Sequence, residues 1–266
     1  VATDGETYGH HRKHGEMALA YCLDYIEKGN RAQLTNYAQF LELYPPQDEA
    51  QIIENSSWSC VHGVERWRAN CGCNSGKPGW HQLWRQPLRE SLDWLRDKAT
   101  EIFEQEGAKV LHNPWTARNE YIHVVLNRTD ENVRQFLKTH ALPDASANRI
   151  LRILEIQRHA MLMYTSCGWF FDEISGIETT QVLQYACRVS QLANQIGDVD
   201  LEPEFMQRLE SAPSNVAQYE NGGGVYKKVV LPSRTNLQRV GIHYAVSSIF
   251  EDEPESLTVF NYNTSN

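Results

Sequence analysis

The sequence predicts a mainly α-helical fold, and three observations support this prediction. Apolar residues recur at three- and four-residue spacing along most of the chain. Glycine or proline stands where several of these patterns stop, as at Gly29, Pro45-Pro46 and Gly107. The chain has 266 residues, of which 41% are hydrophobic and 22% are charged, so it can bury a sizeable core without disulfide bonds.

In the first half of the chain, helices are expected over residues 12–28 and 31–44. Gly29 ends the first, and Pro45-Pro46 ends the second because proline cannot continue a helix. The clearest amphipathic helix follows later and stops before Gly107. Its apolar stripe consists of Leu88, Leu92, Leu95, Ala99, Ile102 and Phe103.

The second half of the chain continues the helical pattern. Helices are expected over residues 129–140, 147–164, 179–195 and 235–250. Residues 221–224, Asn-Gly-Gly-Gly, predict a flexible break that forms a loop over the surface. Residues 256–262 alternate enough to predict a short β segment at the C-terminus.

Charge and cysteine usage narrow the class of protein. Acidic residues outnumber basic ones by nine, which disfavours binding to nucleic acid or to an anionic membrane. Because the chain lacks a signal-peptide pattern and starts at Val1 rather than Met, we expect an excerpt from a longer, cytoplasmic polypeptide. Its six cysteines are then expected to be reduced thiols.

Residues 4–11 contain the first group of candidate catalytic and substrate-contacting residues. If Val1-Ala2-Thr3 ends a buried strand, Asp4 and Glu6 project to the same side of an extended backbone, as a general acid at a barrel mouth would require. The alternative is a polar turn between a strand and a helix.

The octet resembles a signature of glycoside hydrolase family 57, Asp-Gly-Glu-x-Phe-Gly, with Tyr8 at the Phe position. The resemblance implies that Asp4 is the general acid/base, and that Glu6 and His10 line sugar subsites.

The same resemblance implies a domain organisation. Retaining glycosidases use two carboxyl groups roughly 5–5.5 Å apart, and in family 57 the nucleophilic Glu comes from an earlier barrel strand. Residues 1–11 would then be the end of a truncated β/α barrel, residues 12–255 a helical bundle domain, and residues 256–266 the start of a β segment. The missing barrel of the same polypeptide is an expected partner, and this chain alone is expected to be inactive.

Residues 55–84 are irregular and rich in Trp, Gly and Cys, which is typical of a binding segment. Asn55, Trp58, His62, Gly63 and Val64 are similar to a second family 57 signature, Asn-Asp-x-x-Trp-His-Gly-Val, with altered spacing. Together with residues 78–80 and 167–173, the segment resembles the uncharacterised helical domain that follows a family 57 barrel in many bacterial proteins.

These patterns define the expected substrate contacts. Indole faces suit pyranose rings, although large aromatic residues more often pack beneath irregular loops. Two adjacent acids, Asp172 and Glu173, could reach a cleft or simply favour a helix N-terminus. The residues expected to contact a sugar are Glu6, His10, Trp58, His62, Trp67, Trp80, Asp172 and Glu173.

Four soft ligand atoms are offered by Cys60-x-His62 and Cys71-x-Cys73. Structural zinc sites use such ligands, but their pairs are usually spaced by two to four residues, so one-residue spacing makes a tetrahedral site harder to close. Buried thiols or a redox-labile Cys71 and Cys73 pair are the alternatives. We therefore expect neither a metal nor a cofactor.

The leading functional hypothesis is part of a retaining glycoside hydrolase or glucanotransferase that acts on an α-glucan-like oligo- or polysaccharide. One alternative is a non-catalytic helical module that binds carbohydrate or serves as a scaffold. Another is a metal-dependent module built on the four Cys and His residues.

Overall fold

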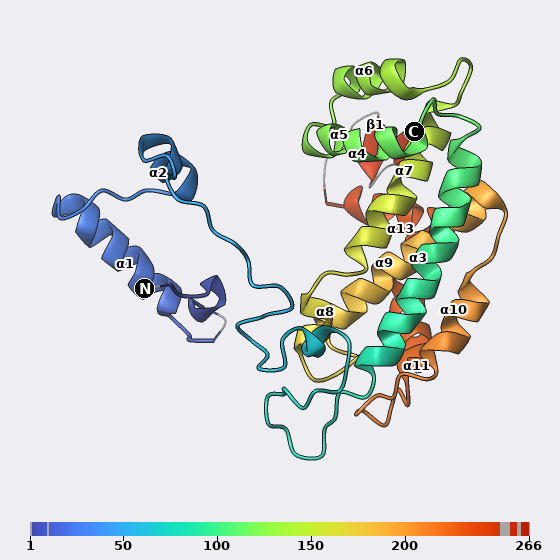
Figure 1. The fold of residues 1–266 in the computed structure, drawn as a ribbon. Helices are drawn as coiled ribbons and strands as arrows, with labels where there is room; N and C mark the ends of the chain where they lie inside the picture. Colours follow the sequence, from blue (N-terminus) through green and yellow to red (C-terminus); the bar gives the residue numbers. More distant parts are fainter. Residues whose placement is uncertain (1, 10, 251–255, 260–261, 266) are drawn as a thin grey trace. The chain divides into compact units, whose positions relative to one another are not determined.

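The computed structural model describes residues 2–9, 11–250, 256–259 and 262–265, and it divides into two compact units, Val1–Glu54 and Asn55–Asn266. Both units are mainly α-helical, as predicted (Figure 1). We refer to them as unit 1 and unit 2. The expected helical domain over residues 12–255 therefore spans parts of both units.

Unit 1 contains a 3-10 helix, Gly5–Thr7, followed by α1 (Gly15–Lys28) and α2 (Tyr37–Leu43). The helix predicted over residues 12–28 is confirmed with a later start. The helix predicted over residues 31–44 is too long at its N-terminus. Asn36 is the N-cap of α2, because its side chain accepts a hydrogen bond from the Gln39 N–H, so the helix begins only at Tyr37. Neither α1 nor α2 has a buried side chain.

Three long helices form the centre of unit 2: α3 (Arg85–Gly107), α7 (Ala147–Leu162) and α9 (Ile177–Gly197). They pack against one another pairwise, and α10 (Glu202–Leu209) lies along α3 (Figure 1). All six apolar residues of the stripe predicted on α3 are buried, so the amphipathic pattern correctly identified its core-facing side.

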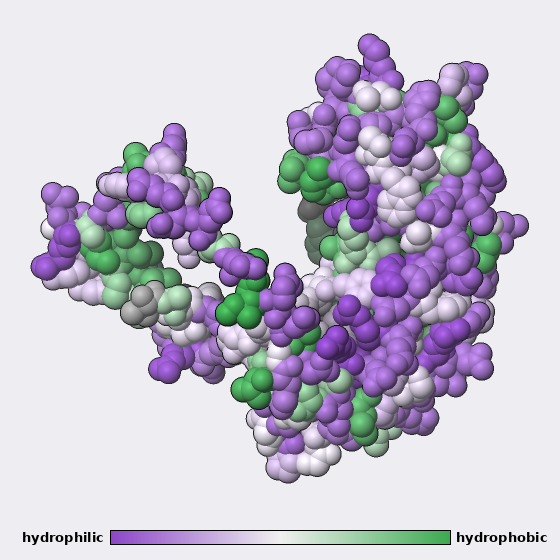
Figure 2. Space-filling view, viewed as in Figure 1, coloured by the Kyte–Doolittle hydropathy of each residue, from purple (hydrophilic) through white to green (hydrophobic). Residues whose placement is uncertain are grey.

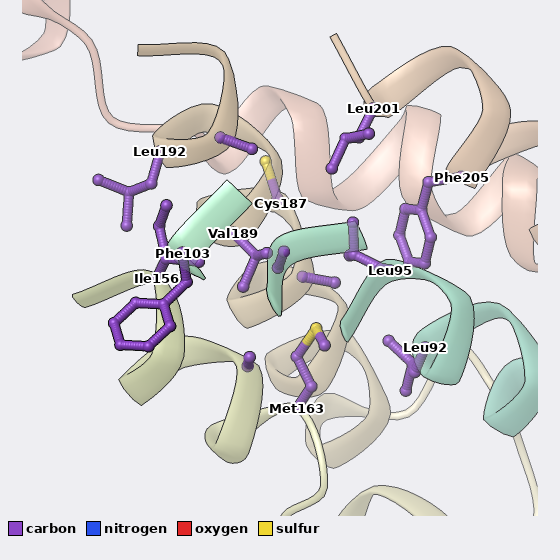
Figure 3. Packing of buried hydrophobic residues seen from close by; sticks show 14 of the residues in the cluster. Leu92, Leu95, Phe103, Ile156, Met163, Cys187, Val189, Leu192, Leu201 and Phe205 are labelled. Carbon is purple, nitrogen blue, oxygen red and sulfur yellow. The ribbon is translucent and has the colours of Figure 1, made fainter. Parts of the chain in front are cut away.

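The core between these helices is aliphatic and aromatic (Figure 3). Its labelled members are Leu92, Leu95, Phe103, Ile156, Met163, Cys187, Val189, Leu192, Leu201 and Phe205. Full burial of one such side chain contributes about 1.5–3 kcal/mol relative to exposure. The three-helix centre therefore provides a rigid body on which irregular segments can dock.

Shorter helices surround this centre. They are α4 (Pro114–Glu120), α5 (Ile122–Leu126), α6 (Asp130–His140) and α8 (Cys167–Phe170). The helix predicted over residues 129–140 is confirmed as α6, and Thr129 caps it by accepting a hydrogen bond from the Asn132 N–H. Asn113 caps α4 in the same way, with Pro114 at its first position.

The predicted flexible break at residues 221–224 is wrong. Asn221 accepts a hydrogen bond from the Gly224 N–H and starts α11 (Gly222–Val225), in which Gly222 and Gly223 are buried. A Cβ on Gly222 would lie 2.9 Å from the Leu209 carbonyl oxygen, so this residue permits a close helix contact. The glycine run therefore serves packing rather than flexibility.

The chain ends in smaller elements. A π-helical turn, Tyr226–Val230, leads into α12 (Leu231–Ser233) and then α13 (Leu237–Ser247), which lies within the predicted helix over residues 235–250. The strands β1 (Ser256–Val259) and β2 (Tyr262–Ser265) pair antiparallel, with Ser256 opposite Ser265. The sequence pattern thus predicted the first strand of this hairpin.

The face of unit 2 shown in Figure 2 is largely hydrophilic, with apolar residues scattered over it. In unit 1, by contrast, apolar side chains of α1 and of the following residues reach the surface, such as Met17 at 65% exposure and Ile52 at 82%. Among the described residues, no helix combines the length and apolar character needed to cross a membrane.

Candidate functional site

The irregular segment Asn55–Trp84 docks against α8 and the residues that follow it. A 3-10 turn, Glu65–Trp67, packs on α8 and donates hydrogen bonds to residues 166 and 170. The rest of the segment is held by hydrogen bonds to Asp172 and Asn215. Residues distant in sequence therefore meet at one end of the helical core.

This segment brings four potential metal ligands together. Cys60 Sγ lies 3.9 Å from His62 Nδ1, 3.9 Å from Cys71 Sγ and 3.8 Å from Cys73 Sγ. Cys73 Sγ lies 3.5 Å from His62 Nδ1, and all four ligand atoms are within 4.8 Å of one another. We call these four residues the Cys/His cluster. Its members come from two short stretches that are eleven residues apart at their starts.

Two glycines with left-handed backbone conformations allow the one-residue spacing. Gly63 follows His62 with φ +77°, and a Cβ there would lie 2.3 Å from the Asn55 carbonyl oxygen. Gly72 separates the two cysteines with φ +83°. Such φ values strain any residue with a Cβ, so the turns that bring the side chains together depend on glycine. The expectation that this spacing hinders closure overlooked these turns.

Two buried arginines border the cluster. Arg66 donates to the carbonyl oxygens of Phe170 at 2.6 Å and Ser59 at 3.0 Å. Arg85, fully buried, donates to the carbonyl oxygens of Phe171 at 3.1 Å and Cys73 at 3.4 Å, and its Nη1 lies 4.0 Å from Cys71 Sγ. Within the described ranges, no carboxylate oxygen lies within 4.0 Å of either guanidinium group. Both Nε atoms are buried without a hydrogen-bond partner among the described residues.

The surroundings change the acidity of the thiols. Burial would raise the pKa of Cys60, but hydrogen bonds from the backbone N–H groups of His62 and Arg66 and from neighbouring side chains lower it to about 7. The pKa of Cys73 is raised by burial and by its thiol neighbours, Cys60 and Cys71. The cluster therefore favours a thiolate at Cys60, which is the form that acts as a metal ligand or nucleophile.

The two adjacent acids predicted as substrate contacts are buried and hydrogen bonded to loops. Asp172 Oδ2 accepts from the Ser75 N–H at 2.9 Å and from the Ser75 hydroxyl. Glu173 accepts from the Asn215 N–H at 2.7 Å and from the Ser214 hydroxyl at 2.5 Å. These bonds give both carboxylates a structural role, and their contact with a substrate stays a prediction.

The tryptophans of this segment differ in exposure. Trp58 is 84% exposed, and its ring centroid lies 6.5 Å from that of Phe170. Trp67 is partly buried and donates from Nε1 to the Ser166 carbonyl oxygen at 3.0 Å. Trp80 is also partly buried, and Lys77 Nζ lies 3.6 Å from its ring centroid. Trp58 therefore presents the most accessible indole face of the three.

The other predicted residues belong to unit 1. Asp4 is exposed and has an extended backbone, with φ −63° and ψ 137°. Glu6 lies in the 3-10 helix rather than on extended backbone, so the alternation argument for its side-chain direction is wrong; its Oε2 is 3.4 Å from His11 Nε2. His10 and Val1 lie outside the described residues.

Sequence reasoning missed Arg66, Arg85, Ser75 and Asn215. The Asn215 side chain bridges two segments, because its Nδ2 donates to the carbonyl oxygens of His81 at 2.9 Å and Asp172 at 3.0 Å. Their partners are far away in sequence, so neither periodicity nor local spacing could have identified these residues.

The fold and the site define a helical protein whose Trp- and Cys-rich segment is docked at one end of a helical core. Residues 80–266 match a family described as a domain of unknown function, DUF3536, and the chain belongs to this family. The match includes Trp80, Asp172 and Glu173, whereas the Cys/His cluster precedes it. No curated protein and no solved structure matches the chain.

Proposed function

We propose that this chain supplies the general acid/base and part of the substrate-binding surface of a retaining carbohydrate-active enzyme similar to glycoside hydrolase family 57. The observation that carries the proposal is the octet at residues 4–11, Asp-Gly-Glu-Thr-Tyr-Gly-His-His, whose first carboxylate, Asp4, is exposed. A proton donor must be accessible to the leaving-group oxygen, and Asp4 meets this requirement.

In the proposed reaction, Asp4 protonates the glycosidic oxygen while a Glu from an upstream barrel strand of the same polypeptide attacks the anomeric carbon. Asp4 then removes a proton from water or from a sugar hydroxyl, which displaces the Glu and releases a product of retained configuration. Glu6 and His10 contact the sugar.

The proposed substrate is an α-glucan-like oligo- or polysaccharide, and the proposed location is the cytoplasm. All six cysteines are free thiols, a state that a reducing compartment maintains. Trp58 supports carbohydrate binding because its exposed indole face can stack on a pyranose ring.

The test replaces Asp4 by Asn in the full-length polypeptide and measures reducing-end release from maltooligosaccharides. Loss of general acid catalysis is expected to lower kcat by about 10²–10⁴-fold. In kcat/KM, which reports formation of the glycosyl-enzyme, the loss should be much smaller on an aryl glycoside whose leaving group needs no protonation, whereas kcat stays low because the second step still lacks its base. Asp24→Asn, which changes an exposed acid of α1 paired with Lys28, is the matched control and should have near-normal activity.

Near-normal turnover of the Asp4→Asn variant on both substrates would refute the catalytic assignment. A non-catalytic carbohydrate-binding module would then be favoured, and Trp58 is the observation that supports it. In that case Trp58→Ala should weaken glucan binding, whereas Val61→Ala, in the same loop and 92% exposed, should not.

A further inference from the structure

Four of the six ligand–ligand distances within the Cys/His cluster are close to the edges of a tetrahedron around one zinc ion, and the other two are below 4.8 Å. Zn–S bonds of about 2.3 Å and Zn–N bonds of about 2.0–2.1 Å at tetrahedral angles place two sulfurs about 3.8 Å apart and a sulfur and a nitrogen about 3.6 Å apart. The S–S distances from Cys60 are 3.8 and 3.9 Å, and the S–N distances to His62 are 3.5 and 3.9 Å. A disulfide bond requires about 2.05 Å between the sulfurs. The cluster therefore has the dimensions of a metal site.

The charges around the cluster also fit a bound metal thiolate. A Zn²⁺ ion with three thiolates and a neutral histidine carries one net negative charge. Arg66 and Arg85 are buried cations without a carboxylate within 4.0 Å among the described residues, and the Asp172 carboxylate acts on Arg85 only from farther away. Burying a charge that is incompletely compensated is costly. Arg85 Nη1 lies 4.0 Å from Cys71 Sγ, so an anionic centre at this position would compensate the guanidinium charges.

Donors also surround the ligands. Arg66 donates to the carbonyl oxygen of Ser59, next to Cys60, at 3.0 Å, and Arg85 donates to the Cys73 carbonyl oxygen at 3.4 Å. Groups of this kind orient metal ligands and stabilise thiolates. A left-handed turn follows His62 at Gly63, and another separates Cys71 from Cys73 at Gly72.

We propose that Cys60, His62, Cys71 and Cys73 bind one Zn²⁺ ion in a structural site. Binding releases the remaining thiol protons to solvent, forms three Zn–S bonds and one bond to His62 Nδ1, and displaces the water ligands of the ion. Four protein ligands fill the tetrahedron, which leaves no open position for a catalytic water. The ion thereby fastens the Asn55–Trp84 segment. His62 then binds the metal rather than a sugar.

The first test measures zinc in the purified chain by mass spectrometry after growth in zinc-supplemented medium and dialysis. We expect one equivalent per chain. Titration of the apoprotein with Co²⁺ under reducing conditions should produce a thiolate-to-cobalt charge-transfer band and the intense visible bands of a tetrahedral ion. Less than stoichiometric zinc together with no charge-transfer band would overturn the proposal.

Variants then identify the ligands. Cys73→Ser and His62→Ala should weaken Zn²⁺ binding in chelator competition by at least about tenfold. Loss of a group that only hydrogen-bonds to a ligand already costs about 10–100-fold in metal affinity, and loss of a ligand should cost no less. His62→Cys should retain stoichiometric zinc, because four thiolates also form a structural site. Cys167→Ser, which changes an exposed thiol of the same unit outside the cluster, is the matched control.

Circular dichroism separates loss of the metal site from loss of the fold. The helical core is expected to persist in the ligand variants, so their helical signal should remain while zinc is lost. Zinc binding by Cys73→Ser with wild-type affinity would contradict the assignment, as would equal losses in Cys167→Ser and Cys73→Ser.

Discussion

At the scale of single residues, the site depends on buried polar groups that tie loops to the helical core. Asp172 shows this most clearly: one oxygen accepts both donors of Ser75, while its main-chain carbonyl accepts from Trp84 Nε1 at 3.1 Å and from Asn215 Nδ2. Ser75 lies two residues beyond Cys73, so the Asp172 carboxylate also positions the second half of the Cys/His cluster.

Replacing Asp172 with Ala should lower the free energy of unfolding by about 1.5–3 kcal/mol, because the buried carboxylate loses its two charge-assisted hydrogen bonds from Ser75. Guanidinium-induced unfolding, followed by circular dichroism, measures the change. The matched control is Glu131→Ala, which removes a carboxylate from an exposed i,i+3 ion pair with Arg134 and should cost less than about 1 kcal/mol. Equal effects of the two variants would contradict the structural role of Asp172.

At the scale of elements, close packing between α8 and α9 holds the docking surface in place. Gly168 on α8 faces Val182 on α9, and a Cβ at Gly168 would lie 2.5 Å from Val182 Cγ2. The Thr179 hydroxyl donates to the Gly168 carbonyl oxygen at 2.7 Å. The absence of a side chain at Gly168 therefore sets the distance between the two helices.

Gly168→Ala should destabilise unit 2 by about 1–3 kcal/mol through overpacking against Val182. Gly241→Ala is the control of opposite sign: this glycine lies in α13, and a Cβ there would have no neighbouring atom within 4 Å. Alanine at this position should stabilise by about 0.4–1 kcal/mol through helix propensity and unfolded-state entropy. Thermal unfolding of both variants measures the difference. Destabilisation of similar size in both would show that the α8–α9 contact is not the cause.

Long amphipathic helices could be predicted from the sequence because their periodicity reports the side that faces the core. The stripe on α3 is an example, and the helices predicted over residues 147–164 and 179–195 are confirmed as α7 and α9, with α7 ending two residues earlier. Short elements such as α4, α5 and α10 were missed, since one or two turns give too little periodicity. The prediction of a loop at residues 221–224 is wrong because glycine occurs both in flexible loops and at close contacts between helices. Only the tertiary structure, which places the Leu209 carbonyl oxygen against Gly222, shows that this is a close contact.

At the scale of the whole molecule, the two units differ in the source of their stability. Unit 2 has a continuous buried core, whereas the described residues of unit 1 include none that is buried. The structural unit also begins earlier than the family match, at Asn55 rather than Trp80. Residues 55–79 are thus part of the folded unit, because they supply partners for Arg85 and Asp172.

A fragment of residues 55–266 should therefore unfold cooperatively at nearly the same temperature as the whole chain. A fragment of residues 80–266 should be less stable by several kcal/mol, since it lacks the hydrogen bonds from Arg66, Trp67 and Ser75 to residues 166–172, at about 0.5–3 kcal/mol each. Differential scanning calorimetry of the three proteins tests this. A similar melting temperature for the shorter fragment would show that the docked segment contributes no stability.

The candidate site was only partly predictable from the sequence. Composition indicates residues 55–84 as the candidate segment, since Trp, Gly and Cys concentrate there. Spacing rules argue against the Cys/His cluster because they describe common turns, whereas this site uses left-handed glycines at Gly63 and Gly72. The arginines and Asn215 were not predictable, because their roles depend on segments that only the tertiary fold brings together.

The bonds that hold residues 55–84 also bear on the time course of folding. Those of Arg66, Trp67, Ser75 and Trp84 join residues separated by 104, 99, 97 and 88 positions. Loop-closure entropy grows slowly with length, by about 0.6 kcal/mol per doubling, so such distant contacts cost the native state little more than shorter ones. Rates of folding, however, fall as contacts become less local. The hydrogen bonds that hold residues 55–84 in the native state are thus among the contacts that slow folding.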